Sequence, residues 1–190
     1  MKRFIPVISL AILLAFAPAA KAAYNTSTQY RAFPSSIQTS LSTVAPEALP
    51  EISRVIVRKG QRKMLLLDSS DKVIKTYGIS LGQNPVGHKL REGDGKTPEG
   101  RYYINGRNEN SKFHLSLRIS YPAQQDIRRA KSLGVSPGGD IYIHGRPNDR
   151  KVALNSRKVD WTDGCIAVND REIREIWQLV PEGTPVDITP

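Results

Sequence analysis

The sequence holds a single cysteine, Cys165, which directly follows the short turn Thr162-Asp163-Gly164. A lone thiol has no disulfide partner in its own chain, so it is either buried and inert or kept free because it reacts. Gly164 allows a backbone to pass close to a substrate, and His144 lies upstream at the end of an apolar run. Together these residue types indicate a thiol nucleophile with an imidazole base.

Such chemistry needs a base for the thiol, a partner that orients the base, and donors for the developing oxyanion. Cys165 is predicted to open a strand after a tight turn, where backbone N–H groups can converge on one point. His144 is predicted to close another strand just before Gly145, so its ring can reach over a neighbouring strand end. The alternative is an inert, buried Cys165 and a strand-end histidine with satisfied hydrogen bonds. Two glycine-flanked strand ends, one of them holding the only thiol, favour the catalytic interpretation.

Two other motif matches are accidental. The run from Gly78 to Gly82 fits the G-x-S-x-G pattern of serine hydrolases, but that pattern needs a helix after the serine, and Pro85 follows closely. Residues 95–97 resemble the end of a phosphate-binding loop. Leu90, however, stands where that loop needs its first glycine, and Pro98 prevents the helix that would hold the phosphate.

A metal site would have to draw on a small set of side chains. None of them shows a ligand spacing such as C-x-x-C or H-x-x-x-H, so a zinc site is not expected. The side chains in question are His88, His114, His144, Asp163 and Cys165.

The elements that must position the cysteine and the histidine are predicted to be mainly β-strands. From Ile52 onward the chain is long enough for one hydrophobic core, and we predict a single domain over residues 52–190. A loop rich in Gly and Pro is predicted over residues 82–100. The predicted strands are residues 54–57, 64–67, 73–81, 101–104, 113–119, 140–144, 165–168 and 185–188.

Two peripheral helices are predicted to interrupt the strands. In the second, apolar residues from Ile173 to Val180 share one face, and Asn169 or Asp170 is the expected N-cap. Trp177 belongs to this face, so we expect it in the core and not at a ligand. The helices are residues 123–133 and 170–180.

The first residues have the organisation of a cleavable export signal. Two basic residues precede an apolar stretch from Phe4 to Ala17, and Ala20-Lys21-Ala22 has the small-x-small pattern of a cleavage site. We predict a signal peptide over residues 1–22 and a flexible Ser-, Thr- and Pro-rich tether over residues 23–51. No cysteine directly follows the apolar stretch at the expected cleavage site, which argues against a lipid anchor. We expect no membrane span after cleavage, and a location in the periplasm or cell envelope.

The formal net charge of the sequence is +10, and it stays positive after removal of the predicted signal peptide. An excess of positive charge favours anionic surroundings such as the cell envelope. The basic residues are scattered, which is typical of a solvated surface. Nucleic acid is not an expected partner, because the chain has no basic-aromatic motif.

These residues resemble those of a known family, the L,D-transpeptidase catalytic domains (YkuD-type). The family signature is a His-Gly strand end followed by Ser/Thr-x-Gly-Cys, which His144-Gly145 and Thr162 to Cys165 match. The run from Lys96 to Tyr102 is similar to the family's T-P-x-G-x-[FY] motif, and Ser136 to Asp140 precedes the histidine strand as in the family. The resemblance extends over nearly all of residues 53–188.

The resemblance implies a mixed β-sandwich-like domain that acts on peptidoglycan stem peptides in the bacterial envelope. In that scheme Cys165 attacks the third-residue carbonyl of a tetrapeptide stem, D-alanine leaves, and an amine resolves the thioester. His144 is the general base and acid, and backbone N–H groups around Gly164 form the oxyanion hole. The resemblance implies no metal or organic cofactor and predicts acylation by carbapenems.

Two positions depart from the family pattern. Many members carry Arg two residues after the cysteine, where this chain has Ala167, so Arg146 is our substitute for holding a substrate carboxylate. Asp163 stands where many members have His or Ser, and we expect it either to bind a substrate ammonium or to cap the turn. Thr162 and Gly145 complete the expected substrate-binding residues.

Three functions stay open at this stage. The leading interpretation is a transpeptidase that transfers the acyl group to an amine acceptor. A hydrolase on the same fold would trim stems as an L,D-carboxypeptidase or cut existing cross-links. A more distant alternative is a non-catalytic wall-binding module, against which the presence of both Cys165 and His144 argues.

Overall fold

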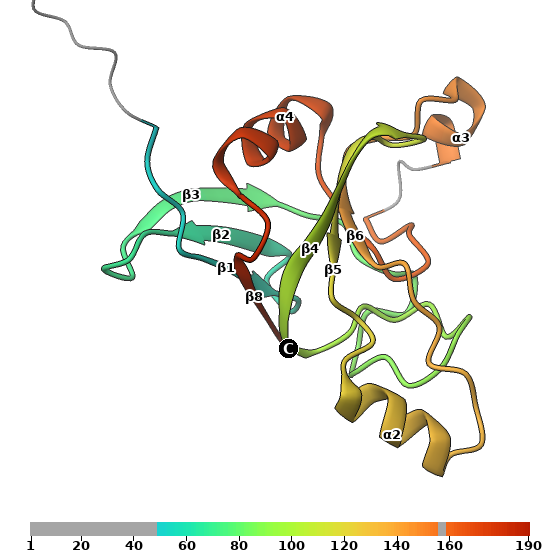
Figure 1. Cartoon of the computed structure of the whole chain (residues 1–190). Helices are drawn as coiled ribbons and strands as arrows, with labels where there is room; N and C mark the ends of the chain where they lie inside the picture. Colours follow the sequence, from blue (N-terminus) through green and yellow to red (C-terminus); the bar gives the residue numbers. More distant parts are fainter. Residues whose placement is uncertain (1–48, 156–158) are drawn as a thin grey trace, which may run out of the picture. The chain divides into compact units, whose positions relative to one another are not determined.

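The computed structural model describes residues 49–155 and 159–190, so the predicted signal peptide and most of the predicted tether lie outside the described residues. The described chain forms one mixed eight-stranded sheet in the order β3-β2-β1-β8-β4-β5-β6-β7 (Figure 1). The prediction of a mainly β fold with peripheral helices is confirmed. The strands are β1 (Arg54–Arg58), β2 (Lys63–Leu67), β3 (Val73–Gly78), β4 (Gly100–Ser111), β5 (His114–Ile119), β6 (Tyr142–His144), β7 (Ile166–Ala167) and β8 (Pro185–Thr189).

Burial follows the apolar pattern of the strands. In β1 the inward residues Val55 and Val57 alternate with more exposed ones, as expected for a strand with one face on the core. In β2 the four residues from Met64 to Leu67 are all buried, so this strand is covered on both faces. Strands β1 and β2 pair antiparallel, whereas β1 and β8 pair parallel.

Strand β4 is much longer than the predicted residues 101–104. Its first residues pair with β8, and after a register shift between Ile104 and Gly106 its remainder pairs with β5. The strand therefore belongs to both halves of the sheet (Figure 1). Its second half was not predicted because the polar run from Asn105 to Ser111 has no apolar alternation.

The two ends of the sheet are linked through the segment that follows β3. The peptide groups of Ser80 and Ala167 exchange hydrogen bonds of 2.9 and 2.8 Å, and Thr162 N–H donates to Leu81 O at 3.1 Å. The single sheet is thus folded back on itself around the core. These bridges also fasten the loop that carries the cysteine, residues 161–165, to the chain after β3.

The helices lie outside the sheet. Asn169 caps the N-terminus of α4, since its side chain accepts from Glu172 N–H while the Glu172 carboxylate accepts from Asn169 N–H, both at 2.9 Å. Trp177 packs against the core but is only half-buried, and the Arg107 guanidinium lies 4.0 Å from the centre of its ring. The helices are α2 (Gln124–Ser132), α3 (Arg150–Asn155) and α4 (Asp170–Leu179).

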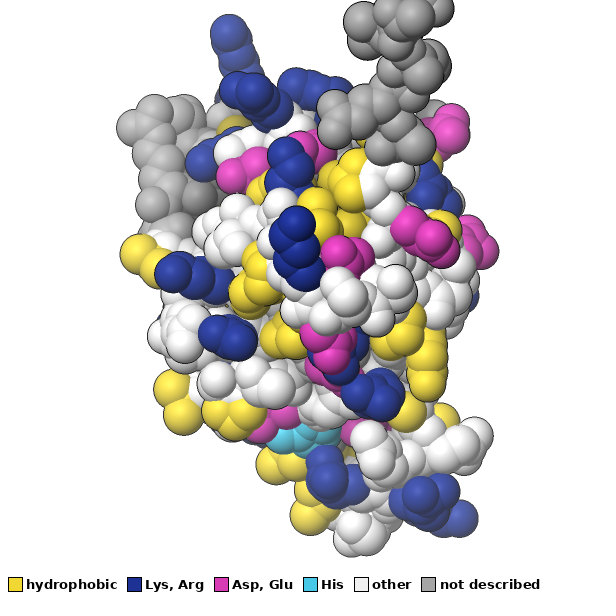
Figure 2. All heavy atoms as spheres, turned by 90° about the vertical axis from the view of Figure 1, so that its left-hand side faces the viewer, with side chains coloured by type: hydrophobic (Ala, Val, Ile, Leu, Met, Phe, Trp, Pro, Cys, Tyr) yellow, Lys and Arg dark blue, Asp and Glu magenta, His cyan; other side chains and the backbone are white. Residues whose placement is uncertain are grey.

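Helix α3 was not predicted, since its six residues are too short to show a helical period. Among the described residues, no helix has the length and apolar character needed to cross a bilayer. On the face drawn in Figure 2, Lys and Arg side chains are scattered among acidic and neutral ones. This distribution agrees with a solvated positive surface on that face.

Candidate active site

Cys165 lies directly before β7, at the end of the loop that the sheet closure fastens. Its side chain is half-buried, with Sγ 3.5 Å from Asp140 O and a further hydrogen bond from the Tyr142 N–H. Cys165 and Asp140 both line two cavities of about 390 Å³ each. The thiol is therefore reachable from two sides, which does not fit the alternative of an inert, buried cysteine.

The parallel pairing of β6 and β7 brings the histidine to the thiol. His144 is opposite Ala167 in the register, and Ala167 is two residues after Cys165. Because side chains two residues apart in extended chain lie on the same face, His144 and Cys165 share a face, and both line the same cavity. The structure thus brings together the two residues that the sequence analysis singled out.

The hydrogen bond of the His144 ring fixes its tautomer. Nδ1 lies 2.7 Å from Gly145 O, and a carbonyl oxygen can only accept, so Nδ1 carries the proton. Nε2 is then left with a lone pair. In this tautomer the ring can take a proton from a thiol at Nε2, while Gly145 O stabilises the cation that forms.

Two aromatic rings hold the imidazole in place. The ring of Phe113 lies 4.5 Å from that of His144 between centroids, and Trp161 meets His144 edge-on at 5.7 Å. Burial in this environment lowers the pKa of His144, although the bond to Gly145 O opposes the shift. His144 is consequently neutral at neutral pH, the form that a general base needs.

The thiol is also neutral in the resting site. Burial, together with the carboxylates of Asp163 and Asp140, raises the pKa of Cys165 to about 11, although the Tyr142 N–H and the charge of Lys89 oppose the shift. At pH 7 only roughly one thiol in ten thousand is then ionised. A nucleophile in this state depends on a base at the moment of attack.

Thr162 organises the turn before the cysteine. Its hydroxyl donates to Cys165 O at 2.7 Å and accepts from Gly164 N–H at 3.2 Å. Since the Gly164 N–H is already used, it is a poor oxyanion donor. Cys165 lies outside the strand pairing, and its N–H makes no backbone hydrogen bond within the described chain. The Cys165 N–H is therefore the better oxyanion donor.

Only glycine fits at position 164, because of the backbone conformation there and because there is no room for a Cβ atom. Its φ is +131°, and a Cβ built on it would lie 2.6 Å from Lys96 O. We expect Gly164→Ala to lower the rate of thiol acylation at least tenfold, because Lys96 or Cys165 must shift. Intact-mass kinetics with an acylating β-lactam would measure this.

Gly183→Ala is the matched control for that substitution. Gly183 also has a positive φ, +87°, but no atom lies within 4 Å of its ideal Cβ. This variant should lose only about 1 kcal/mol of stability from backbone strain and keep the acylation rate. An equal loss of rate in both variants would show that the contact of Gly164 with Lys96 is unimportant.

The loop over residues 82–100 forms a wall of the second cavity. Asp94 organises it by accepting hydrogen bonds from the N–H groups of Leu90, Arg91 and Lys96 and from Lys89 Nζ, which is 2.9 Å away. Although burial opposes the shift, these bonds hold the pKa of Asp94 at about 2. The charge of buried Lys89 is thereby compensated inside the loop.

The other expected substrate-binding residues lie in different places. Asp163 is exposed, accepts from Gln83 Nε2 at 3.2 Å and lines the second cavity together with Cys165. Arg146 lines a separate cavity of about 510 Å³ that Cys165 does not line. The N–H of Gly145 donates to Phe113 O at 3.0 Å, so Gly145, like Thr162, helps to hold the site in position.

The remaining histidines do not approach the thiol. His114 Nε2 lies 3.0 Å from Arg174 Nη1, and His88 accepts from Glu99 N–H while its Nε2 lies 3.2 Å from Asp126 Oδ1. Neither lines a cavity with Cys165. Within residues 49–155 and 159–190, no three side chains of the His, Cys, Asp and Glu types lie close enough together to hold a metal ion.

A family model described as YkuD, L,D-transpeptidase catalytic domain, matches residues 52–188. The chain belongs to the L,D-transpeptidase catalytic domain family. The predicted membership is therefore confirmed. In sequence the chain is 25% identical to YkuD of Bacillus licheniformis over 76% of this chain and 69% of that protein. It is 27% identical to YqjB of Bacillus subtilis over 74% of this chain and 73% of that protein. The names of both relatives assign them to the L,D-transpeptidases.

The solved structures similar to this L,D-transpeptidase domain include the helical cell shape determining protein Pgp2 from Campylobacter jejuni. It has a TM-score of 0.58 and 26% identity over 73% of this chain and 48% of that chain. Bd1075 of Bdellovibrio bacteriovorus has a TM-score of 0.52 and 24% identity over 76% of this chain and 53% of that chain, which supports the fold alone. This chain spans about half the length of both structures.

Three residues around the thiol and the base could not be singled out from the sequence by the signals used for Cys165 and His144. Phe113 and Trp161 enclose the His144 ring, and Tyr142 supplies an N–H to the Cys165 thiol. Trp161 directly precedes the cysteine turn, which was an available signal. Phe113 gave none, because only the pairing of β5 with β6 brings its turn beside His144.

Proposed function

We propose that this L,D-transpeptidase domain is an exported cysteine acyltransferase that acts on peptidoglycan stem tetrapeptides in the cell envelope. The observation that carries the proposal is the cavity shared by Cys165 and His144, in which the histidine tautomer leaves Nε2 as a base. Membership of the family supplies the substrate class, and the predicted signal peptide supplies the location.

The first half-reaction forms a thioester. His144 Nε2 takes the proton of Cys165 as Sγ attacks the carbonyl carbon of the third stem residue at its L-centre. The N–H of Cys165 stabilises the oxyanion. When the intermediate collapses, the C–N bond breaks, and His144 returns the proton to the amine of the departing D-alanine. The products are a thioester at Cys165 and free D-alanine.

The second half-reaction transfers the acyl group to an amine. The acceptor nitrogen attacks the thioester, a new amide bond forms, and the thiolate leaves and regains a proton through His144. Two cavities adjoin the thiol, which gives room for a donor and an acceptor on either side of the sulfur. A positioned amine reacts faster than bulk water because orientation supplies effective molarity. We therefore propose transfer as the main outcome.

The proposed role in the cell is modification of the wall by cross-linking, lipoprotein attachment or D-amino acid exchange. Pgp2, which shares the fold, is described as a determinant of helical cell shape. By extension, loss of this protein is expected to change cell shape through the wall.

Product analysis tests the proposal. The purified protein is supplied with disaccharide tetrapeptide alone and then with excess D-amino acid, and products are separated by chromatography and identified by mass. Cross-linked dimer, or exchange of the terminal D-alanine, is expected. Tripeptide as the only product under both conditions would move the assignment to an L,D-carboxypeptidase. Absence of any product from the tetrapeptide under both conditions would contradict the proposed function.

A further inference from the structure

The two cavities beside the thiol differ in charge. We name the first the aromatic cavity and the second the acidic cavity. Apart from Asp140, which lines both, the aromatic cavity has Lys112 as its one charged side chain, and the acidic cavity has Glu92 and Asp163. The aromatic cavity is lined by Asn108, Asn110, Ser111, Lys112, Phe113, Ser116, Asp140, Tyr142, His144 and Cys165. The acidic cavity is lined by Lys89, Glu92, Gly93, Gly95, Gly138, Gly139, Asp140, Ile141, Asp163 and Cys165.

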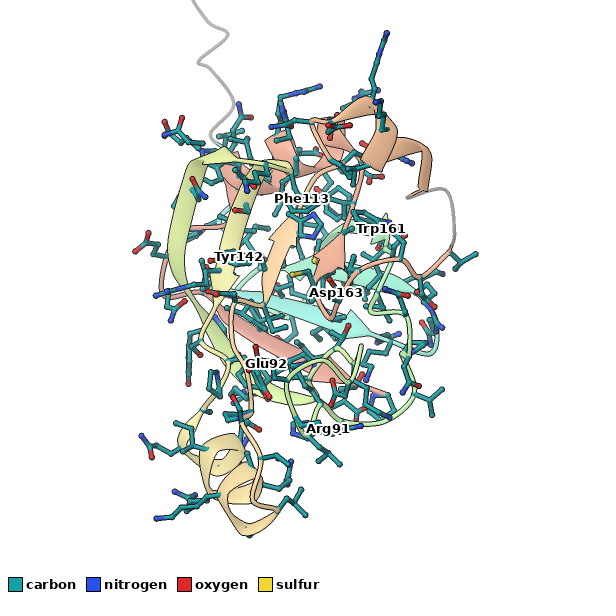
Figure 3. The ribbon with its side chains drawn as sticks, turned by 90° about the vertical axis from the view of Figure 1, so that its right-hand side faces the viewer. Arg91, Glu92, Phe113, Tyr142, Trp161 and Asp163 are labelled. Atoms are coloured by element: carbon teal, nitrogen blue, oxygen red, sulfur yellow. The ribbon has the colours of Figure 1, made fainter. Side chains whose placement is uncertain are left out.

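The one cation of the acidic cavity is already paired. Lys89 is buried, with Nζ 2.9 Å from Asp94 Oδ1, so it adds little positive charge to the cavity. Figure 3 shows Phe113 toward one end of this row of side chains and Glu92 toward the other, with Tyr142 and Asp163 between them. The charge of the lining residues therefore becomes more negative from the aromatic cavity, which Lys112 and Asp140 line, to the acidic cavity, which Glu92, Asp140 and Asp163 line.

The backbone of Lys112 is held in place by its neighbours, whereas its side-chain ammonium is available to a ligand. It lies in the two-residue turn between β4 and β5, whose flanking residues Ser111 and His114 are paired. Its carbonyl accepts from Asn148 N–H at 2.9 Å, which anchors the turn to the chain after β6. Its side chain is exposed, and the ammonium makes no ion pair with any residue of the described ranges.

The substrate of the proposed reaction carries opposite charges on the two sides of the attacked carbonyl. The leaving residue of a tetrapeptide ends in a free carboxylate next to the scissile bond. A diamino acid at the third position carries an ammonium on its side chain, on the acyl side. A peptide that binds across the thiol can place both of its charges next to opposite charges of the protein in only one of its two orientations.

We propose that Lys112 is a specificity-determining residue that pairs with the carboxylate of the leaving residue in the aromatic cavity. Asp163, with Glu92 beyond it, then faces the ammonium of the acyl-side residue in the acidic cavity. This inference rests on the proposed function. It replaces Arg146 as the carboxylate anchor, since Arg146 lines a cavity that Cys165 does not line.

Lys112 in this role also affects which donor peptide is preferred. A stem whose fourth residue is still in amide linkage to a fifth has no carboxylate at the position that Lys112 reaches. It would leave Lys112 without a partner, so the charge of Lys112 favours tetrapeptide donors over pentapeptide donors. The opposite direction of binding brings like charges together and is disfavoured.

The test compares two donors, a tetrapeptide with a free terminal carboxylate and the same peptide with a terminal amide. Binding to the Cys165→Ala protein and kcat/KM of the intact thiol enzyme are both measured. Both measurements are made with Lys112 unchanged and in the variants Lys112→Gln, Lys112→Arg and Lys131→Gln. The last is the control, because Lys131 is an exposed lysine on α2 that lines neither cavity. Reaction of Cys165 with neutral iodoacetamide confirms an intact site in each thiol-containing variant.

The free acid is expected to bind and react about fivefold better than the amide, the size of a partly exposed charge pair, and more so at low salt. Lys112→Gln should abolish the ratio, while Lys112→Arg and Lys131→Gln retain it. Turnover with the same ratio in Lys112→Gln would overturn this inference and leave the proposed function standing. If neither peptide bound or turned over, both this inference and the proposed function would be overturned.

A second pair of donors examines the acidic cavity. A free side-chain amine at the third residue should be preferred to its acetylated form, and Asp163→Asn should remove much of that preference. Since acetylation leaves the terminal carboxylate in place, Lys112→Gln should not change this ratio. If Lys112→Gln and Asp163→Asn each changed both the acid-to-amide ratio and the amine-to-acetylated ratio, the assignment of one substrate charge to each cavity would be contradicted.

Discussion

Replacing Cys165 with alanine is expected to leave the protein folded and to abolish thioester formation completely. The side chain is half-buried and small, and its loss removes a contact with Asp140 O and little else, so stability should change by about 1 kcal/mol or less. No other cysteine exists in the sequence that might substitute. A carbapenem should add its whole mass to the wild-type protein by ring opening, and no adduct should form on the variant.

Cys165→Ser is the matched control for this substitution. The hydroxyl keeps the size of the side chain and its contact with Asp140 O, but it is a far weaker nucleophile than a thiol. We expect folding as in the wild type, measured by thermal unfolding, with an acylation rate close to that of Cys165→Ala. Equal carbapenem adducts on the wild type and on Cys165→Ala would rule out Cys165 as the nucleophile.

The strands and the reactive pair could be predicted because each depends on local signals. Short apolar runs between Gly- and Pro-rich turns indicate strands wherever they occur, and all eight predicted strands have a counterpart in the sheet. Cys165 and His144 were found because each stands at a glycine-flanked strand end. The β6–β7 pairing that joins them is between parallel strands, whose partners the sequence does not specify.

The surroundings of Arg146 could not be predicted from the sequence. Arg146 was chosen because it lies two residues from His144, but β6 ends at His144 and the chain turns there. The N–H of Arg146 donates to Asp170 Oδ1 at 2.8 Å, and the residue lines the separate cavity beside α4. Lys112, thirty-two residues before His144 in the sequence, lines the aromatic cavity instead. Only the antiparallel pairing of β5 with β6 makes that arrangement, and no local pattern indicates it.

Replacing His144 with alanine is expected to slow acylation of Cys165 by roughly two to four orders of magnitude, the usual range for general acid–base catalysis. The effect is expected to be large because a thiol pKa raised to about 11 leaves almost no thiolate at neutral pH. His144→Gln is the control, because an amide fills much of the space between Phe113 and Trp161 without acting as a base.

The pH dependence separates a base from a merely structural ring. In the wild type the acylation rate should rise with pH as His144 loses its proton, and the midpoint should lie below the ordinary histidine value because burial lowers that pKa. Above this midpoint the neutral imidazole is fully present and the rate should level off. It should rise again only as the thiol itself ionises toward its own raised pKa.

In His144→Ala and His144→Gln the lower rise should disappear, and only the increase that follows thiol ionisation should remain. The measurement is the rate of acylation or alkylation at Cys165 across the pH range, followed by intact mass. If both variants kept the lower rise at its wild-type position, another group would be activating the thiol. His114 would then be the next candidate by residue type, although it lines neither cavity with Cys165 and its Nε2 faces Arg174. Because the lower rise depends on the loss of a proton from Nε2, it distinguishes loss of the base from loss of packing, which would lower the rate equally at every pH.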